Sequence, residues 1–175
     1  AIECPGAVPG PAEAAAMLGS REWYDRLRGA RMLELMGPRA APAEGALVRW
    51  YADEEGGSAA EVSVFQGSIV RALGGMRASS PGALALLLGA LASLNGGVPS
   101  AASQALAAIG APAVPVLVRG LQSDAGGVQY YSASALAQIG PPAAAAIPEL
   151  QKLARSTNAD LRSIAEKALR AIRGQ

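Results

Sequence analysis

Apolar residues recur at helical spacing in five successive stretches of the chain. In the last stretch they stand at i, i+3, i+4, i+7, i+8 and i+11, namely at Leu161, Ile164, Ala165, Ala168, Leu169 and Ile172. The same offsets fit residues 128–139 and 98–109, and they fit 62–73 and 25–36 less strictly. A stripe of this period predicts a helix with one buried face. We therefore expect five such first helices.

The stripes follow one another at a nearly constant distance. They begin near positions 25, 62, 98, 128 and 161, which gives a repeat of 30–37 residues. The hexapeptide Ala-Leu-Ala-Ala-Ile-Gly at 105–110 recurs with one change at 135–140. A period of this size is typical of stacked helical hairpins.

A second apolar segment follows each of the first four stripes, and 47–49, 87–89 and 117–119 occupy equivalent places in it. Glycines stand where a left-handed helix end would let the chain reverse, at Gly37, Gly74, Gly110 and Gly140. We expect four second helices. A short helix over 11–18 would belong to an N-terminal extension and cap (1–19), and residues 20–175 would form the repeat domain.

The stretch 128–150 resembles the short HEAT repeat called the PBS-lyase HEAT-like repeat. The resemblance is carried by Val128, Ala133, Ala135, Leu136, Ile139, Gly140, Ala146, Ile147, Pro148 and Leu150. It is good over 98–173 and faint over 25–97. It implies an all-α fold, a right-handed α-solenoid (α-α superhelix) of about five HEAT-like helical hairpins. In such solenoids a row of second helices presents a concave surface to another macromolecule.

In this family an arginine follows the first apolar position of the first helix, and it often pairs with an aspartate to form a ladder between repeats. Arg26 and Arg162 stand at that place, whereas Ser63, Pro99 and Gln129 replace the arginine in the middle units. The ladder is broken, so packing of small apolar residues must hold the stack instead.

The resemblance favours a non-catalytic protein-protein interaction or scaffolding module, an accessory subunit that docks on a larger multi-subunit complex. Some relatives with this repeat are bilin lyases or act on phycobilisomes. The alternative is therefore a bilin-lyase-like protein that holds a pigment or modified chain in the concave groove. Fold alone does not choose between the two.

The composition excludes several kinds of active site. The 175 residues include no histidine, which excludes a Ser-His-Asp triad, a Cys-His nucleophile and a His-ligated metal. The acidic run 53–55 precedes a Gly-Gly link, where neighbouring carboxylates fan out and do not converge on a metal. We therefore predict no catalytic, cofactor-binding or metal-binding residue.

The net charge of +1 lacks the basic footprint of a duplex-binding protein, so no nucleic-acid partner is expected. A third hypothesis, nucleic-acid recognition, rests only on a C-terminal excess of basic residues: Arg155, Arg162, Lys167, Arg170 and Arg173.

Aromatic and arginine residues give the first candidates for partner binding, because Trp, Tyr and Arg are enriched in interface hot spots. Trp50 follows Arg49 on a second helix, and Arg119 holds the place of Arg49 two units later. Tyr130 stands off the apolar stripe, beside Tyr131. Partial burial in the solenoid is the competing interpretation for Trp50.

Residues 78–118 form a run of 41 positions without a charged side chain. Leu86 and Gly89 take outward places in the second helix of this run, and neighbouring units carry arginine, Arg49 and Arg119, at the place of Gly89. A partner or a peripheral membrane surface that covers this face would explain the missing charges. A merely neutral surface of Ala, Ser and Gly is the alternative. We predict that Leu86 and Gly89 mark the centre of a docking face.

The remaining features concern the terminus and the membrane. Cys4 is the single cysteine and is interpreted as an unpaired thiol. The longest apolar stretch, 83–94, has 12 residues, well short of the roughly 20 that span a bilayer. The chain begins with Ala1, and from this we favour an exported, periplasmic protein with a processed N-terminus over a cytoplasmic one.

Overall fold

The computed structural model describes residues 9–52 and 57–174, so Cys4 and the acidic run 53–55 lie outside the described residues. The described chain is built from α-helices and three 3-10 segments. Their bounds are α1 Pro11–Met17, α2 Trp23–Met36, η1 Gly37–Ala43, α3 Glu44–Trp50, α4 Ala59–Gly75, α5 Pro81–Ala90, α6 Val98–Ile109, η2 Ala111–Ala113, α7 Val114–Leu121, α8 Gly126–Ile139, η3 Pro141–Ala146, α9 Ile147–Leu153 and α10 Ala159–Arg173.

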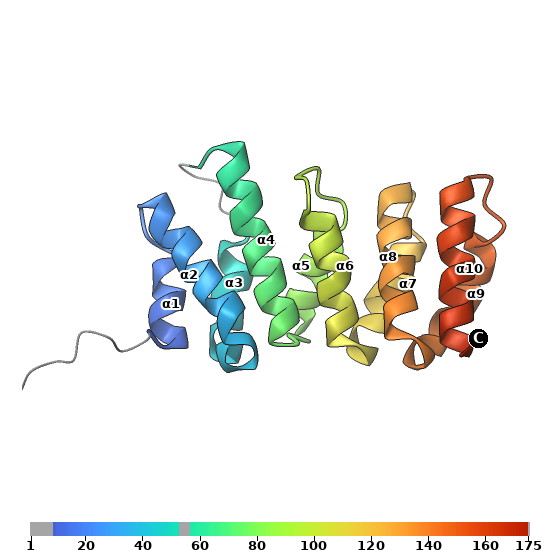
Figure 1. Ribbon diagram of the computed structural model, residues 1–175, viewed down its shortest axis with the longest axis horizontal. Helices are drawn as coiled ribbons and strands as arrows, with labels where there is room; N and C mark the ends of the chain where they lie inside the picture. The colour runs from blue at the N-terminus through green and yellow to red at the C-terminus, as the bar shows by residue number, and fades with distance from the viewer. Residues whose placement is uncertain (1–8, 53–56, 175) are drawn as a thin grey trace, which may run out of the picture.

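The helices form two rows. The first helices α2, α4, α6, α8 and α10 stand side by side, and the shorter second helices α3, α5, α7 and α9 lie behind them (Figure 1). Each first helix packs against the next, and α1 packs against α2 at the N-terminal end of the row. This arrangement confirms the predicted all-α solenoid of stacked hairpins.

The apolar stripes are the faces that pack between and behind the first helices. In α10 all six stripe residues from Leu161 to Ile172 are buried. In α6 the six stripe residues from Val98 to Ile109 are buried as well. Many of the fully buried positions are alanines, and small side chains allow neighbouring helices to approach closely.

The reversals between first and second helices confirm three of the four glycine predictions. Gly37, Gly110 and Gly140 have φ of 54°, 81° and 71°, a region that favours glycine because it has no Cβ. The prediction for Gly74 is wrong, because α4 continues to Gly75 and the positive φ of 54° falls on Arg77. Gly74 instead provides room for α6, since a Cβ there would lie 2.7 Å from the Ala105 Cα.

Polar side chains tie several first helices to the link that precedes them, at the position where the family carries its arginine. Arg26 Nε donates to Ser20 O at 2.6 Å, and Gln129 Nε2 donates to Leu121 O at 3.2 Å. Arg162 Nη1 donates to Ser156 O and to Thr157 O, at 2.9 Å each. Gln129 thus takes over the role of an arginine in its unit. In these three units, a hydrogen bond from the first helix to the preceding segment of the chain stands where the ladder arginine is expected.

Arg26 also joins the first two units through aromatic rings. It is buried, and its guanidinium lies 5.4 Å from the Trp23 ring centroid and 5.9 Å from that of Trp50. The Trp23 ring in turn lies 5.3 Å from Phe65 of α4. These contacts fix α2, α3 and α4 relative to one another.

Candidate protein-interaction surface

Large hydrophobic side chains that face solvent are concentrated on the first two long helices of the front row. In the described part of the chain such exposed residues are Tyr24, Leu35, Val64, Leu94 and Tyr130. Tyr24 and Leu35 of α2 are 75% and 74% exposed, and Val64 of α4 is 56% exposed. Single exposed hydrophobics are ordinary, but these three share one side of the α2–α4 pair.

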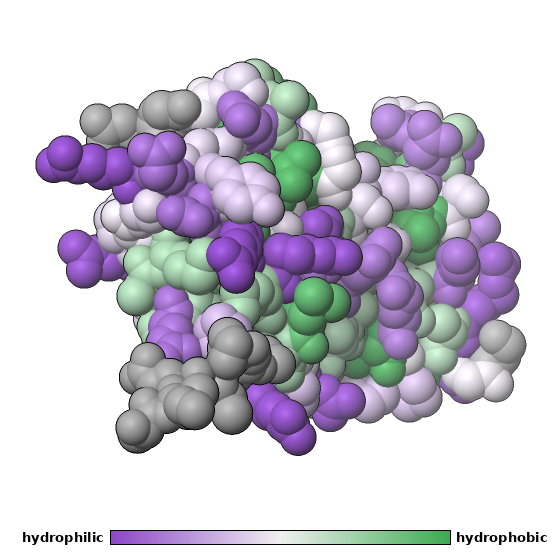
Figure 2. Space-filling view, turned by 60° about the vertical axis from the view of Figure 1, so that its left-hand side comes forward, coloured by the Kyte–Doolittle hydropathy of each residue, from purple (hydrophilic) through white to green (hydrophobic). Residues whose placement is uncertain are grey.

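We call this side the first-helix patch and define it by Tyr24, Leu27, Met32, Leu35, Met36 and Val64. Two hollows lie within it. One, of about 370 Å³, is lined by patch residues together with Arg28, Arg31 and Ser68. The other, of about 450 Å³, lies between Met32, Leu35, Met36 and Arg39. Figure 2 brings the N-terminal end of the molecule forward and shows hydrophobic and hydrophilic residues side by side on its surface.

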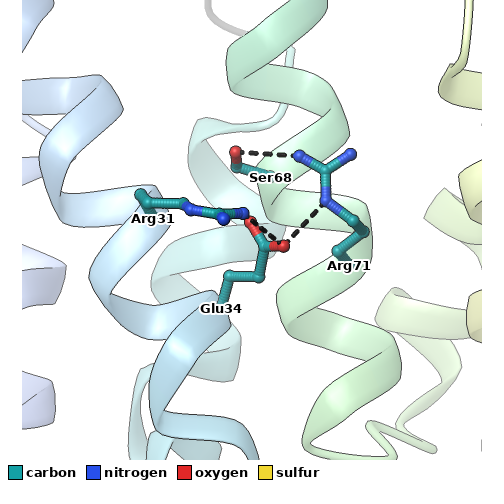
Figure 3. Close-up of polar contacts among 4 residues, drawn as sticks. All are labelled: Arg31, Glu34, Ser68 and Arg71. Atoms are coloured by element: carbon teal, nitrogen blue, oxygen red, sulfur yellow. Dashed lines mark hydrogen bonds and ion pairs between the residues drawn. The ribbon is translucent and has the colours of Figure 1, made fainter.

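A small ion-pair cluster bridges α2 and α4 at the patch (Figure 3). Glu34 Oε1 accepts from Arg31 Nη1 at 2.7 Å and from Arg71 Nε at 2.8 Å. Arg71 also donates to the Ser68 hydroxyl at 3.2 Å. The Glu34 side chain is only 15% exposed, so this carboxylate sits between the helices while its arginines reach the surface.

The patch carries a clear excess of positive charge. Four arginines, Arg28, Arg31, Arg39 and Arg71, stand in or beside it, and Glu34 is the acidic residue among them. The side chains of Arg28 and Arg39 make no ion pair or hydrogen bond with any described residue. The local charge of these five side chains is therefore +3.

The predicted partner-binding residues of α3 lie elsewhere, on the second row. Arg49 is exposed, and its guanidinium lies 5.4 Å from the Trp50 ring centroid. Trp50 is half-buried, and its ring packs against Gly19, where an added Cβ would lie 2.9 Å from it. The competing interpretation of Trp50, partial burial, therefore describes its position.

The prediction that Leu86 is exposed is wrong. Leu86 is half-buried and packs against the core, because α5 is flanked by α3 on one side and α7 on the other. Gly89 does face open space, with nothing within 4 Å of a built Cβ, and Arg119 of α7 is exposed. Arg49, Gly89 and Arg119 thus occupy successive helices of the second row.

Tyr130 belongs to the other row, on α8, which follows α7 in the chain and packs against it. It is 40% exposed on α8 and makes an edge-to-face contact with Tyr131, with ring centroids 5.5 Å apart. It lines a hollow of about 500 Å³ beside the start of α10. The structure therefore does not bring the six predicted residues into one site.

The first-helix patch was missed because sequence reasoning followed only the buried stripes. The signal that could have found it is the weakness of the first two stripes. Tyr24, Arg28, Arg31 and Leu35 follow a second helical stripe at i, i+4, i+7 and i+11 on α2. A helix with apolar residues on two stripes is a candidate for a face that is buried only in a complex.

Among the described residues, no group of three or more Cys, Asp or Glu side chains is arranged to hold a metal ion. Glu149 is paired with Lys152 at 2.8 Å, and this hydrogen bond lowers the pKa of the Glu149 carboxyl. None of the helices in the described ranges is both long and apolar enough to cross a membrane.

Comparisons with known proteins agree with this architecture. The model of the PBS lyase HEAT-like repeat matches residues 128–156. The complex of CpcE and CpcF of phycocyanin lyase from Nostoc sp. PCC7120 is 23% identical with a TM-score of 0.62, and the match covers 98% of this chain and 68% of that one. No curated protein matches the sequence significantly.

Engineered repeat proteins are similar in structure as well. One engineered protein is 24% identical with a TM-score of 0.58, over 93% of this chain and 78% of its own. A computationally designed armadillo repeat protein for modular peptide recognition is 20% identical with a TM-score of 0.55, over 91% of this chain and 81% of that one. At such identities the likeness shows the fold alone. The chain is therefore a helical repeat protein that carries a PBS lyase HEAT-like repeat, as its sequence predicted.

Proposed function

We propose that this chain is a non-catalytic protein-interaction module, an accessory subunit that docks on a larger assembly through the first-helix patch. The observation that carries the proposal is the exposure of Tyr24, Leu35 and Val64 around two surface hollows. Burying one such side chain in an interface contributes about 1.5–3 kcal/mol, or about one to two decades of affinity. Three neighbouring residues of this kind form an apolar cluster of the sort that lies at the centre of specific interfaces.

The surroundings of the patch support a preorganised binding face. Its side chains stand on two long helices that pack against each other, and the Arg31–Glu34–Arg71 cluster bridges those helices. A rigid face loses little conformational entropy when a partner docks. The likeness to one chain of a two-protein lyase complex and to peptide-recognising repeat proteins is consistent with this role.

The test is quantitative co-purification from the source under mild conditions. Tagged wild type should retain a stoichiometric partner, and Leu35→Lys should lose it. Leu94→Lys is the matched control, because Leu94 is fully exposed on the link before α6. Arg119→Glu probes the second row, which holds the predicted residues Arg49, Gly89 and Arg119.

Retention of the partner by Leu35→Lys together with its loss in Arg119→Glu would assign binding to the second row. Absence of any stoichiometric partner, with chromophore absorbance in the purified native protein, would favour the bilin-lyase-like alternative.

A further inference from the structure

The chemistry of the first-helix patch also specifies the kind of partner segment that it fits. We infer that the patch binds an amphipathic α-helix of the partner whose apolar face is flanked by acidic residues. This inference rests on the proposed function and adds the identity of the docked segment. It follows from the shape of the patch, from the polar groups that it lacks and from its charge.

The shape is that of a shallow trough along two helices. The exposed stripe of α2 runs from Tyr24 to Leu35, which at the helical rise is about 16 Å or three turns. On α4, Val64, Ser68 and Arg71 follow one another at i, i+4 and i+7 on the side that faces α2. The smaller hollow is lined from both helices. A ridge of side chains on a third helix matches such a trough in length and spacing.

The polar groups of the patch exclude an extended peptide as a good occupant. The backbone groups of α2 and α4 are engaged within their own helices, so they cannot pair with a bound strand. Among the patch and its bordering side chains, the oxygen acceptors are the Tyr24 and Ser68 hydroxyls and the partly buried Glu34 carboxylate. The arginines could donate to some C=O groups of an extended segment, but most of its N–H groups would lose water without finding an acceptor, which is costly. A helix satisfies its backbone internally and avoids this cost.

The positive charge of the patch favours a partner helix whose apolar face is flanked by acidic residues. Arg31 and Arg71 share Glu34, whereas Arg28 and Arg39 have no acidic partner among the described residues. Arg28 lines the smaller hollow and Arg39 the larger one. Each hollow thus offers apolar contact together with one uncompensated guanidinium. A partner helix with leucines toward the hollows and carboxylates at their rims complements both features.

Two other occupants fit less well. An anionic membrane surface would match the charge of the patch, but a flat headgroup layer has no ridge of side chains to fill the two hollows. A second copy of this chain would bring a like-charged patch of +3 against its own in a two-fold contact, which is repulsive. Both occupants are outcomes of the test below.

The probe is a fluorescein-labelled helical peptide of 18 residues with leucines at i, i+4, i+7 and i+11 and glutamates beside them. Its matched control carries lysines in place of the glutamates. Fluorescence anisotropy at low salt should show the glutamate peptide binding at least about tenfold more tightly than the lysine peptide. Leu35→Lys should weaken this binding about tenfold or more, whereas Leu94→Lys should leave it unchanged.

A charge reversal separates recognition from non-specific stickiness. The double variant Arg28→Glu with Arg39→Glu should reverse the preference, so that the lysine peptide becomes the tighter ligand. Equal affinity for both peptides, no binding of either, or an unchanged preference in the double variant overturns the inference. So does binding to phosphatidylglycerol vesicles, or a concentration-dependent dimer, that Leu35→Lys abolishes.

The failure of this inference is distinguishable from failure of the proposed function. If the native partner is lost with Leu35→Lys but cross-linking maps its contact to an extended or basic segment, the docking role stands and the helix inference fails. If the native partner is retained by Leu35→Lys, the proposed docking face itself fails.

Discussion

Glycine residues determine how closely neighbouring helices approach in the middle of the stack. At Gly74 in α4, an added Cβ would lie 2.7 Å from both the Cα and the Cβ of Ala105 in α6. The Cα is backbone and cannot move aside cheaply. At Gly89 in α5, an added Cβ would have no atom within 4 Å.

We therefore expect opposite effects from the same substitution. Gly74→Ala should lower the free energy of unfolding by about 1–3 kcal/mol, because α4 and α6 must separate. Gly89→Ala should raise it by about 0.5–1 kcal/mol, because alanine is the better helix former at an open position. Urea unfolding of both variants measures the difference, and equal effects would contradict the packing described for Gly74.

The position of Arg26 gives a second test at the scale of the residue. Its guanidinium lies between two indole rings and donates from Nε to Ser20 O at 2.6 Å. Arg26→Met should cost about 1–3 kcal/mol of stability, since the acceptor loses a charged donor. Arg28→Met on the exposed side of α2 should stay within about 0.5 kcal/mol. Similar losses in both variants would show that burial of Arg26 carries no special stabilisation.

Individual side-chain positions were the least predictable feature from sequence. The outward place of Gly89 followed from alignment with Arg49 and Arg119 and is correct. The same alignment places Leu86 outward, but Leu86 is partly buried against the core, and α5 packs against both α3 and α7. The sequence pattern of one helix does not show which residues of other units will pack against it.

The start of α4 shows how a helix end responds to pH. Ser58 and Glu61 form a reciprocal cap: Glu61 Oε2 accepts from the Ser58 N–H at 2.9 Å and from its hydroxyl at 2.7 Å. These bonds, the backbone one first, lower the pKa of Glu61 below its ordinary value of 4.5. The cap is therefore fully formed above pH 4.5 and is lost as the pH falls through the lowered pKa.

Ser58→Ala should raise the Glu61 pKa toward its ordinary value, because one of the two donors is removed. Carboxyl carbon shifts followed by NMR between pH 2 and 7 measure this directly. The backbone donor remains, so a partial shift is expected. An identical titration midpoint in both proteins would show that the hydroxyl does not hold the carboxylate.

At the other end of the chain, α10 covers α8 and α9 with its buried stripe and turns its charged residues outward. Removing residues 160–175 should expose the preceding hairpin. We expect a loss of about 3 kcal/mol or more and a drop in Tm of about 6–12 °C, with reduced solubility. Removing 174–175 alone is the control. An unchanged Tm and unchanged solution behaviour after the longer truncation would contradict the role of α10 as a cap.

Helical elements were largely predictable, because strict stripes such as 161–172 leave one interpretation. The end of α4 was not. Gly74 looked like the other helix-ending glycines, yet its small size is used for packing against Ala105, and the reversal falls three residues later at Arg77. A glycine in sequence does not reveal whether its conformational freedom or its lack of a side chain is needed.

For the whole molecule, the repeat period and its resemblance to a known repeat were sufficient to predict the α-solenoid. The interaction surface was not predictable in the same way. Residues such as Tyr24 and Val64 form a surface only because α2 and α4 pack side by side and leave both residues on one exposed face. The 41 uncharged residues that suggested a docking face expose mainly Ala, Ser, Gly and Pro, with Leu94 as the large exposed hydrophobic residue.

Site-specific photocrosslinking in the source tests most directly whether the protein docks through the first-helix patch. A photoreactive phenylalanine analogue is placed in turn at positions 35 and 64 in the patch, and at 89 and 119 on the second row. We expect the same partner to be cross-linked from positions 35 and 64 and not from 89 and 119. Cross-links that form only from 89 and 119 would contradict the assignment of the patch and would restore the second row as the docking face.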